Sequence, residues 1–354
     1  MVPIRAVQGG PSFRPRVVVA AGSQQLVEAI FPPVVREELA VVADVAKDIV
    51  LDWSAPSARD ELAVADVVVS GWGAPRLEEE HLVGAPHLVA VLQAGGDARA
   101  AIDVDAAIRR GIALSDAGED NAQPVAEYTL AAILTAGKDL VRAERLYRER
   151  QAFIDREAEF ADAGNYGRTV GVVGASRIGR RVLELLRPFD FEVLVADPTI
   201  TDDDARSLGA ELTSLDGLLR RSDTITLHVP VTPETTGMIG SAELAVLRGG
   251  ATLINTSRGA VVDQDALVEA IRAGRIRAVL DVTEPDPLPA GHPLYMLPGV
   301  VLTPHMAGAV GREIARLGSF IVGELSCLTR GEPLRGQGRY ASPVSPNTDQ
   351  EGSQ

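Results

Sequence analysis

The chain has 354 residues, enough for two domains with buried cores. A hydrophobic content of 46% excludes a disordered chain, and a formal net charge of −15 argues against nucleic acid, whose binding depends on basic side chains that neutralise phosphates. No apolar run reaches the ~20 residues of a membrane span, and residues 1–16 hold no apolar signal segment, so we expect a cytoplasmic protein with no membrane partner.

Short apolar strands alternate with helical patterns through the first third, which is typical of a parallel α/β sheet. Strands are expected at residues 16–21, 65–70, 88–93 and 112–115. Helical segments such as residues 33–40 and 76–83 fall between them. No glycine-rich phosphate loop follows the first strand, so this half is the less suited to hold a nucleotide.

An apolar stripe at helical spacing predicts one long helix over residues 121–150, followed by an irregular charged stretch. A second strand–helix series comes next, with strands expected at residues 169–173, 192–196, 224–228, 252–255, 277–281 and 300–303. The last helix, residues 309–329, has no strand after it. We expect residues 1–15 to be flexible and residues 336–354 to form a disordered tail, because such polar, Gly- and Pro-containing segments bury too little surface to offset their ordering entropy.

A glycine-containing turn opens this second series. Gly174 permits a tight turn and Gly179 lets the helix pack closely on the strand, so that free amides at the helix start would face a pyrophosphate. Ser176 replaces the middle glycine of this fingerprint, so its side chain must point away from the phosphate or donate its hydroxyl to it. Asp197 ends the next strand, where an acid binds ribose hydroxyls and repels a 2′-phosphate. The pattern favours NAD over NADP; the alternative is a structural turn with a surface Asp.

Three chemically active side chains follow later strands of this series. Arg258 can fork onto a carboxylate, and His305 can donate a proton near neutral pH. A carboxylate at the other ring nitrogen would orient the imidazole, and Glu284 and Asp286 compete for that position. Each residue alone would be an ordinary loop residue, but together they stand where ligands bind to a nucleotide-binding sheet. Nothing in the sequence indicates a metal site.

At these residues the chain resembles the D-isomer-specific 2-hydroxyacid dehydrogenase family, in its phosphoglycerate dehydrogenase-like form. The resemblance spans roughly residues 16–335 and rests on residues 125–127, 174–179, 255–259, 280–287 and 303–305. It implies an α/β fold of two doubly wound parallel-sheet domains. A Rossmann-type cofactor domain, residues 121–307, is inserted into a flavodoxin-like substrate-binding domain, residues 16–120 plus 308–335. It further implies a homodimeric, NAD-dependent oxidoreductase that transfers a hydride between nicotinamide and a small 2-hydroxy or 2-oxo acid.

The resemblance also assigns roles to single residues. Arg258 matches the substrate-binding arginine, Asp286 the orienting acid and His305 the proton donor, and the backbone amides of Gly95 and Gly96 match the loop that takes the substrate carboxylate. The residues expected around the cofactor are Gly174, Ser176, Arg177, Ile178, Gly179, Asp197, His228, Val229, Pro230, Thr235, Thr256, Ser257, Asp281 and Gly308. Asp286 is one methylene shorter than the family's glutamate, and residues 96–99 depart from the family's Gly-x-Asp-Asn string, so the resemblance does not name the substrate.

Two other functions stay open. The same site could oxidise a phosphonate or phosphite, because an arginine and a backbone-amide loop accept such anions equally well. The chain could instead be a dinucleotide-sensing binding protein, as the transcriptional corepressors of the family are. The intact Arg–acid–His set disfavours the second alternative, while the shorter acid at Asp286 keeps it open.

Overall fold

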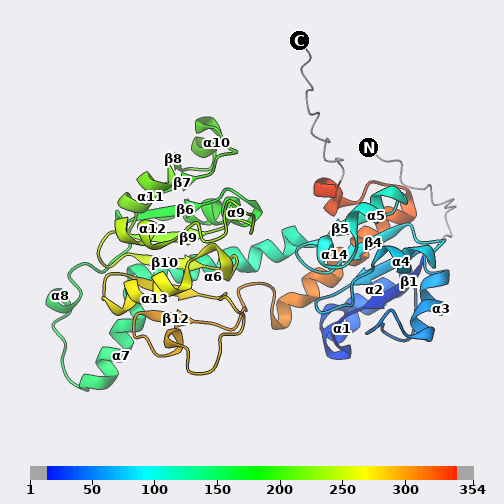
Figure 1. Ribbon diagram of the computed structural model, residues 1–354, viewed down its shortest axis with the longest axis horizontal. Coiled ribbons are helices and arrows are strands. Elements are labelled where there is room, and N and C mark those ends of the chain that lie inside the picture. The colour runs from blue at the N-terminus through cyan, green and yellow to red at the C-terminus, as the bar shows by residue number, and fades with distance from the viewer. Residues whose placement is uncertain (1–13, 341–354) are drawn as a thin grey trace, which may run out of the picture. The chain divides into compact units, whose positions relative to one another are not determined.

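The computed structural model describes residues 14–340; most of the predicted flexible N-terminal segment and of the predicted tail lie outside these residues. The chain divides into two compact units, residues 1–121 with 311–354, and residues 122–310 (Figure 1). We refer to them as the substrate unit and the cofactor unit, after the roles that the sequence suggests. Helix α6 (Gly118–Gly137) begins in the first and ends in the second.

The substrate unit contains a five-stranded parallel sheet. Its strands are β1 (Arg16–Ala20), β2 (Asp44–Val45), β3 (Val67–Ser70), β4 (Ala90–Gln93) and β5 (Ala113–Asp116), in the order β2-β1-β3-β4-β5. This is the 2-1-3-4-5 order of flavodoxin-like sheets. Its α-helices are α1 (Gln24–Ile30), α2 (Pro33–Val42), α3 (Pro56–Val64), α4 (Glu79–Val83), α5 (Val104–Arg109) and α14 (Ile314–Arg330). Helix α14 packs against α1 and α2, so the last helix returns to the fold that the first residues begin.

The cofactor unit contains a seven-stranded parallel sheet (Figure 1). Its strands are β6 (Thr169–Val173), β7 (Glu192–Ala196), β8 (Glu211–Leu212), β9 (Thr224–Leu227), β10 (Thr252–Asn255), β11 (Arg277–Leu280) and β12 (Val300–Leu302). The order β8-β7-β6-β9-β10-β11-β12 is the Rossmann order with one strand added. The helices that follow these strands are α9 (Arg177–Leu186), α10 (Asp202–Ser207), α11 (Leu215–Arg221), α12 (Ser241–Val246) and α13 (Gln264–Arg272). The expected fold class of two doubly wound parallel sheets is therefore confirmed.

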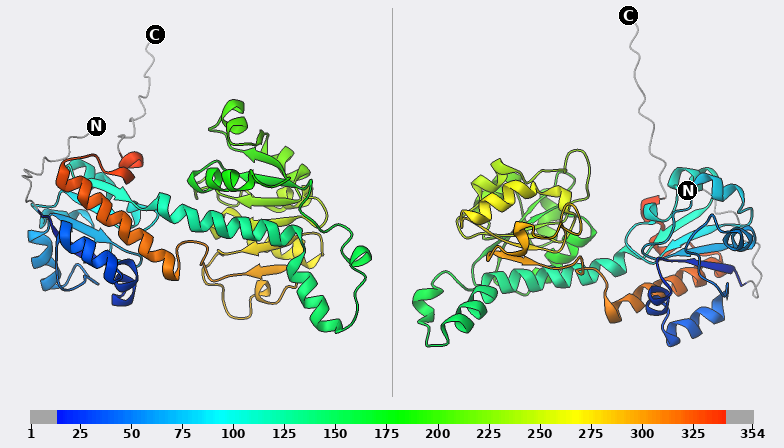
Figure 2. Two further views of the ribbon diagram at one scale, coloured as in Figure 1. Left: turned by 180° about the vertical axis from the view of Figure 1, so that it is seen from behind. Right: turned by 60° about the horizontal axis from the view of Figure 1, so that its bottom comes forward.

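The prediction of a single helix over residues 121–150 is wrong in one respect, because this stretch forms two helices. Helix α6 ends at Gly137, and α7 (Leu140–Arg150) begins after Asp139, whose backbone is left-handed. A Cβ at Gly137 would overlap the side-chain oxygen of Asn165, and the Gly137 carbonyl accepts the amide of Gly164. Contacts with this later segment, which also holds α8 (Arg156–Glu159), break the helix at this place. Figure 2 shows the blue-green helix α6 running along the cofactor sheet, with α7 following it in a different direction.

The C-terminal part of the fold also differs from expectation. Helix α14 begins at Ile314, after a 3₁₀ turn, and not at residue 309. Residues 335–340 form a further 3₁₀ helix, η5 (Arg335–Tyr340), and the Tyr340 side chain is buried in the core of the substrate unit. Residues 336–340, predicted to belong to the tail, thus form part of η5, and the packing of Tyr340 supplies buried surface that composition did not reveal. None of the helices between residues 14 and 340 is long and apolar enough to cross a membrane.

Candidate active site

The predicted site residues of the cofactor unit follow the carboxyl ends of its strands. Gly174 follows β6, Asp197 follows β7, and His228 follows β9. Arg258 lies in the turn after β10, and His305 in the loop after β12. The strand order reverses between β6 and β9, and ligands of doubly wound sheets bind outside the carboxyl ends at such a point.

The turn after β6 is built for close approach of backbones. Gly174 has a φ of +94°, and a Cβ there would lie 2.8 Å from the His228 carbonyl oxygen. A Cβ at Gly179 would overlap the Gly174 carbonyl. Ser176 is the N-cap of α9, and its hydroxyl accepts the Gly179 amide at 3.4 Å. The serine at the middle-glycine position thus turns its side chain toward the helix, while Arg177 and Ile178 are half-buried in the first turn.

Asp197 closes the same turn from the next strand. One carboxylate oxygen accepts the Ala175 amide at 2.6 Å, and the other accepts the amide and hydroxyl of Thr199 at 2.8 and 2.6 Å. Burial alone would raise the pKa of Asp197, but these hydrogen bonds outweigh it, so the pKa lies below its ordinary value. The residue therefore carries a negative charge beside the glycine turn.

His228 contributes its backbone to this turn and keeps its side chain in the core. Its amide donates to the Val173 carbonyl at 2.8 Å, while the ring Nε2 lies 2.9 Å from the Thr226 hydroxyl. Complete burial lowers the pKa of His228 to about 3, so the ring is neutral. In the loop that follows, the Thr235 hydroxyl donates to the Pro230 carbonyl at 2.6 Å, and Val229 lies beside Gly174.

The turn after β10 presents Arg258. Asn255, 1% exposed, accepts the amide and hydroxyl of Ser257 at 3.0 and 2.8 Å, and its own amide group donates to the Arg258 carbonyl at 2.9 Å. The Thr256 hydroxyl lies 3.2 Å from that of Thr129. The Arg258 side chain is exposed, and one guanidinium nitrogen donates to the Ser257 carbonyl at 2.6 Å. Asn255 organises this turn. The sequence indicated no role of its own for it, because a buried Asn at the end of a strand resembles any turn residue.

A glycine joins this turn to the loop after β11. A Cβ at Gly259 would overlap the backbone of Thr283. Only glycine permits the two loops to touch here, and the contact brings the Arg258 turn next to the segment that carries Asp286. The side chain of Gln264 holds the same segment through the Glu284 backbone, at 2.9 and 3.1 Å.

Asp281 fixes the loop that carries His305. Its carboxylate is 1% exposed and accepts the Thr303 hydroxyl at 2.6 Å and the amides of Met306 and Ala307 at 2.8 and 2.7 Å. The His305 amide donates to the Asp281 carbonyl at 3.0 Å. His305 has a φ of +53°, which non-glycine residues adopt rarely. The Asp281 carboxylate thus holds residues 303–307, directly before Gly308.

His305 and Asp286 form the central pair of the site. The imidazole Nδ1 lies 2.7 Å from Asp286 Oδ2, and the two side chains are 51% and 38% exposed. The shorter aspartate therefore reaches the ring. Within the described part of the chain, no hydrogen bond engages the other ring nitrogen, Nε2. Among residues 14–340, no bond joins Arg258 to either member of the pair.

In the substrate unit, Gly95 and Gly96 follow β4. Gly95 is buried, and a Cβ there would lie 3.0 Å from both Gln93 Nε2 and Trp72 Nε1. Gly96 is half-buried. Gln93 and Trp72 thus leave little space for a side chain at Gly95. At this position the loop presents backbone only.

Comparison with known proteins identifies the family. The family model described as D-isomer specific 2-hydroxyacid dehydrogenase, NAD binding domain, matches residues 130–307, half of the chain. The chain belongs to this family. D-3-phosphoglycerate dehydrogenase of Mycobacterium leprae is 36% identical over 260 residues, which are 73% of this chain and 48% of that protein. The chain thus spans about half the length of this curated relative.

Solved structures of 2-hydroxyacid dehydrogenases share the whole fold. A phosphoglycerate oxidoreductase from Rhizobium etli has a TM-score of 0.78 and 27% identity, with 92% of this chain and 97% of that chain covered. D-lactate dehydrogenase from Aquifex aeolicus, solved with NAD and lactic acid, has a TM-score of 0.68 and 29% identity, with 89% and 96% covered. The match to the NAD binding domain gives NAD as the cofactor.

Proposed function

We propose that this family member is an NAD-dependent D-2-hydroxyacid dehydrogenase acting on a small 2-hydroxy or 2-oxo acid. The observation that carries the proposal is the His305–Asp286 contact of 2.7 Å at the edge of a sheet whose sequence matches an NAD binding domain. A binding protein would need no such acid–imidazole pair, and nothing on the site favours phosphite or phosphonate over a carboxylate.

In this proposal His305 moves the proton. Asp286 accepts from Nδ1 and orients the ring, so that a proton on Nε2 can be directed at the substrate. During reduction, the Nε2–H bond breaks and an O–H bond forms on the substrate carbonyl oxygen; oxidation reverses this transfer. Arg258 binds the substrate's anionic group beside the reacting carbon with its planar fork. In the substrate unit, the amides of Gly95 and Gly96 take the carboxylate.

The residues present fit NAD. The lack of side chains at Gly174 and Gly179 lets the turn and the helix approach closely, and the start of α9 offers amides to a pyrophosphate. Asp197 would hold the adenosine ribose, and residues 228–230, 235, 256 and 257 would line the remainder. When bound, NAD takes up or supplies the hydride.

The proposal is tested by following nicotinamide absorbance with the purified protein, NADH and a panel of 2-oxo acids that includes pyruvate, hydroxypyruvate and glyoxylate. We expect NADH consumption with at least one of them. NAD reduction by phosphite or a phosphonate alone would support the alternative substrate class. NADH binding without turnover of any compound would indicate a sensing protein.

Asp197 gives a prediction about cofactor choice. Its charge should make kcat/KM for NADH exceed that for NADPH by about 100-fold or more, since like charges at the ribose cost several kcal/mol in a partly buried site. Asp197→Asn should narrow this ratio. Matched kinetics with both cofactors on both proteins check this; equal values for the unaltered protein would place Asp197 away from the ribose.

Asp286 gives a prediction about the rate of reduction. Asp286→Asn keeps the size of the side chain but removes the carboxylate that accepts from Nδ1, so kcat for reduction should fall by about tenfold or more. Glu284→Gln is the matched control, because Glu284 is held through its backbone, and it should leave kcat within about threefold. A larger loss of kcat in the Glu284 variant than in the Asp286 variant would show that Glu284, and not Asp286, orients His305.

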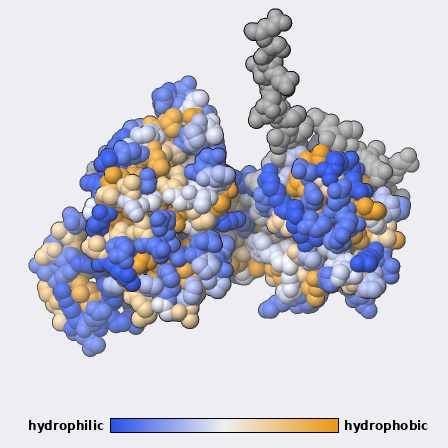
Figure 3. Space-filling view, viewed as in Figure 1, coloured by the Kyte–Doolittle hydropathy of each residue, from blue (hydrophilic) through white to orange (hydrophobic). Residues whose placement is uncertain are grey.

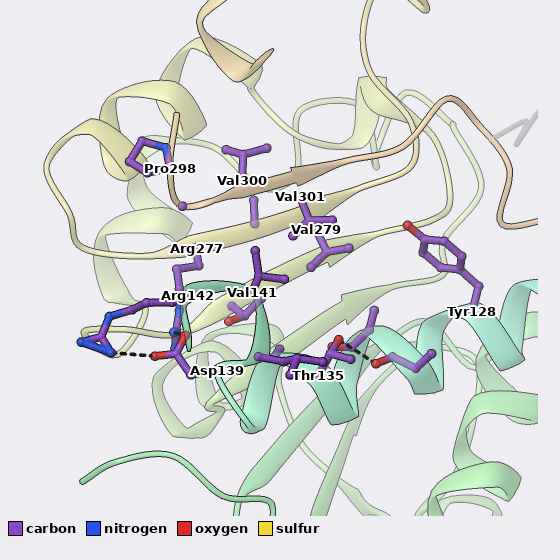
Figure 4. Close-up of a pocket in the computed structure, with 17 residues that line it drawn as sticks. Tyr128, Thr135, Asp139, Val141, Arg142, Arg277, Val279, Pro298, Val300 and Val301 are labelled. Carbon is purple, nitrogen blue, oxygen red and sulfur yellow. Dashed lines mark hydrogen bonds and ion pairs between the residues drawn. The ribbon is translucent and has the colours of Figure 1, made fainter. Parts of the chain in front are cut away.

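We also propose that the protein is a homodimer formed through the cofactor unit. An apolar groove lies between α6–α7 and strands β11–β12, lined by Tyr128, Val141, Val279, Val300 and Val301 among others (Figure 4). The segment 139–167 exposes large apolar side chains: Leu140, Val141, Tyr147, Phe153 and Tyr166. Apolar residues are visible among charged ones in this region in Figure 3. In a dimer with two-fold symmetry, the exposed apolar residues of each subunit can pack into the groove of the other subunit.

Phe153, 89% exposed, is the sharpest test of this interface. Phe153→Glu should weaken dimerisation by at least about tenfold, because a charge would replace a ring that the proposed interface buries. Sedimentation velocity over a concentration series measures the change. A monomeric unaltered protein at micromolar concentration would contradict the proposal.

A further inference from the structure

The C-terminal 3₁₀ helix of the substrate unit is anchored next to the loop after β4. Glu324 of α14, 0% exposed, accepts the Ser115 hydroxyl at 2.6 Å and the Arg335 side chain at 2.9 Å. Gly336 donates its amide to Glu324 at 3.3 Å, and a Cβ at Gly336 would overlap the Asp116 carbonyl. This close fit fixes η5 against the end of β5.

From this anchor, Tyr340 reaches the loop that contains Gly95 and Gly96. Its hydroxyl accepts the Ala98 amide at 2.7 Å and lies 2.6 Å from Asp116 Oδ2 and 3.0 Å from Asp97 Oδ1. A hydroxyl has one proton and two lone pairs, so it accepts from Ala98 while donating to a carboxylate. Burial and the neighbouring Asp116 raise the pKa of Tyr340, so the proton stays in place. The side chain is 8% exposed and belongs to the unit's core.

The two glycines lie between two fixed points. On one side the Ala94 amide donates to the Ser70 carbonyl at 2.8 Å, and on the other the Ala98 amide donates to Tyr340. Gly95 and Gly96 have no Cβ and can adopt many backbone conformations. The direction of their amides therefore depends on both fixed points, and the second comes from a residue that is distant in sequence. Arg99 reinforces it, since its guanidinium pairs with Asp97 at 3.2 Å and lies over the Tyr340 ring at 5.7 Å.

We propose that Tyr340 is a positioning residue that holds residues 94–99 in the conformation that binds the substrate carboxylate. The inference rests on the proposed function for the identity of the ligand, but its structural part does not. The Tyr340 hydroxyl contacts residues 97, 98 and 116 and not the His305–Asp286 pair, so the effect should appear in substrate binding more than in the chemical step.

The test uses the full chain with Tyr340→Phe, which keeps the ring in the core and removes only the hydroxyl. We expect KM for the 2-oxo acid to rise by about tenfold or more, with kcat within about threefold and the NADH dissociation constant unchanged. Gln337→Ala is the control in the same 3₁₀ helix; between residues 14 and 340, the Gln337 side chain has no hydrogen bond to the loop. It should behave like the unaltered protein.

Amide hydrogen exchange separates positioning from general stability and needs no turnover. In Tyr340→Phe, exchange at residues 98–101 should accelerate about tenfold or more, while β1 and β3 keep their protection. Unchanged exchange in this loop, or faster exchange spread over the whole unit, would overturn the inference. Absence of turnover by the unaltered protein would instead overturn the proposed function, leaving the exchange result to judge Tyr340.

Discussion

His305→Ala should lower kcat for reduction of a 2-oxo acid by ~10²–10⁴-fold, the usual effect of removing a positioned proton donor. The loss follows from the geometry. Asp286 fixes the imidazole of His305 at Nδ1, and the Asp281 carbonyl accepts the backbone amide of His305. No other histidine follows β12, so no neighbouring ring can replace it. Steady-state kinetics with saturating NADH measure the change.

The NADH dissociation constant should stay within about threefold in this variant, since the glycine turn and Asp197 belong to other strands. His87→Ala is the matched control, because His87 is exposed and lies in the substrate unit. Turnover of His305→Ala within a few-fold of the unaltered protein would mean that the proton comes from another group.

Arg258→Lys should reduce kcat/KM for the 2-oxo acid by about 10- to 100-fold, because lysine keeps the charge but loses the planar fork and its paired hydrogen bonds. Arg258→Gln should cost more, about 10²–10⁴-fold, since the charge is lost as well. The structure supports this sensitivity. Asn255 fixes the backbone of Arg258, and the Ser257 carbonyl accepts from one guanidinium nitrogen of Arg258. The backbone should therefore stay in place when the side chain is replaced.

Arg272→Lys serves as the control for this exchange, because Arg272 is an exposed residue of α13 that pairs with Glu269 at 2.9 Å. Its kinetics should match those of the unaltered protein. A normal kcat/KM in Arg258→Lys would show that the fork of Arg258 does not bind the substrate anion and that the Gly95–Gly96 amides suffice.

Local sequence patterns predicted most of the fold. Most strands of the cofactor unit are short apolar runs, and a glycine or an acid directly follows several of them, as Gly174 follows β6, Asp197 follows β7 and Asp281 follows β11. The two-residue edge strands β2 and β8 were missed, because such short segments carry no period. The break between α6 and α7 was also missed. It depends on Asn165 packing at Gly137, and helical periodicity does not report a contact across 28 positions.

The site was predicted in its chemical groups but not in its supports. Motif spacing placed Asp286 and His305 at strand ends, yet only coordinates show that the shorter acid reaches the ring. Asp281 and Asn255 accept hydrogen bonds from backbone amides, and Gly259 lets two loop backbones touch. The identities of the side chains in a sequence do not indicate such supporting roles. Tyr340 was hidden for a related reason. It lies in a segment with the composition of a tail, and its partners Ala98 and Asp116 are more than 200 residues away.

Analysis of the product is the sharpest test of hydride transfer to a 2-oxo acid with D stereochemistry. Pyruvate or hydroxypyruvate would be reduced with NADH carrying deuterium at the transferred position, and the product analysed by chiral chromatography and NMR. We predict a single D-2-hydroxy acid with deuterium at C2. An L or racemic product, or deuterium that stays in the coenzyme, would contradict the account.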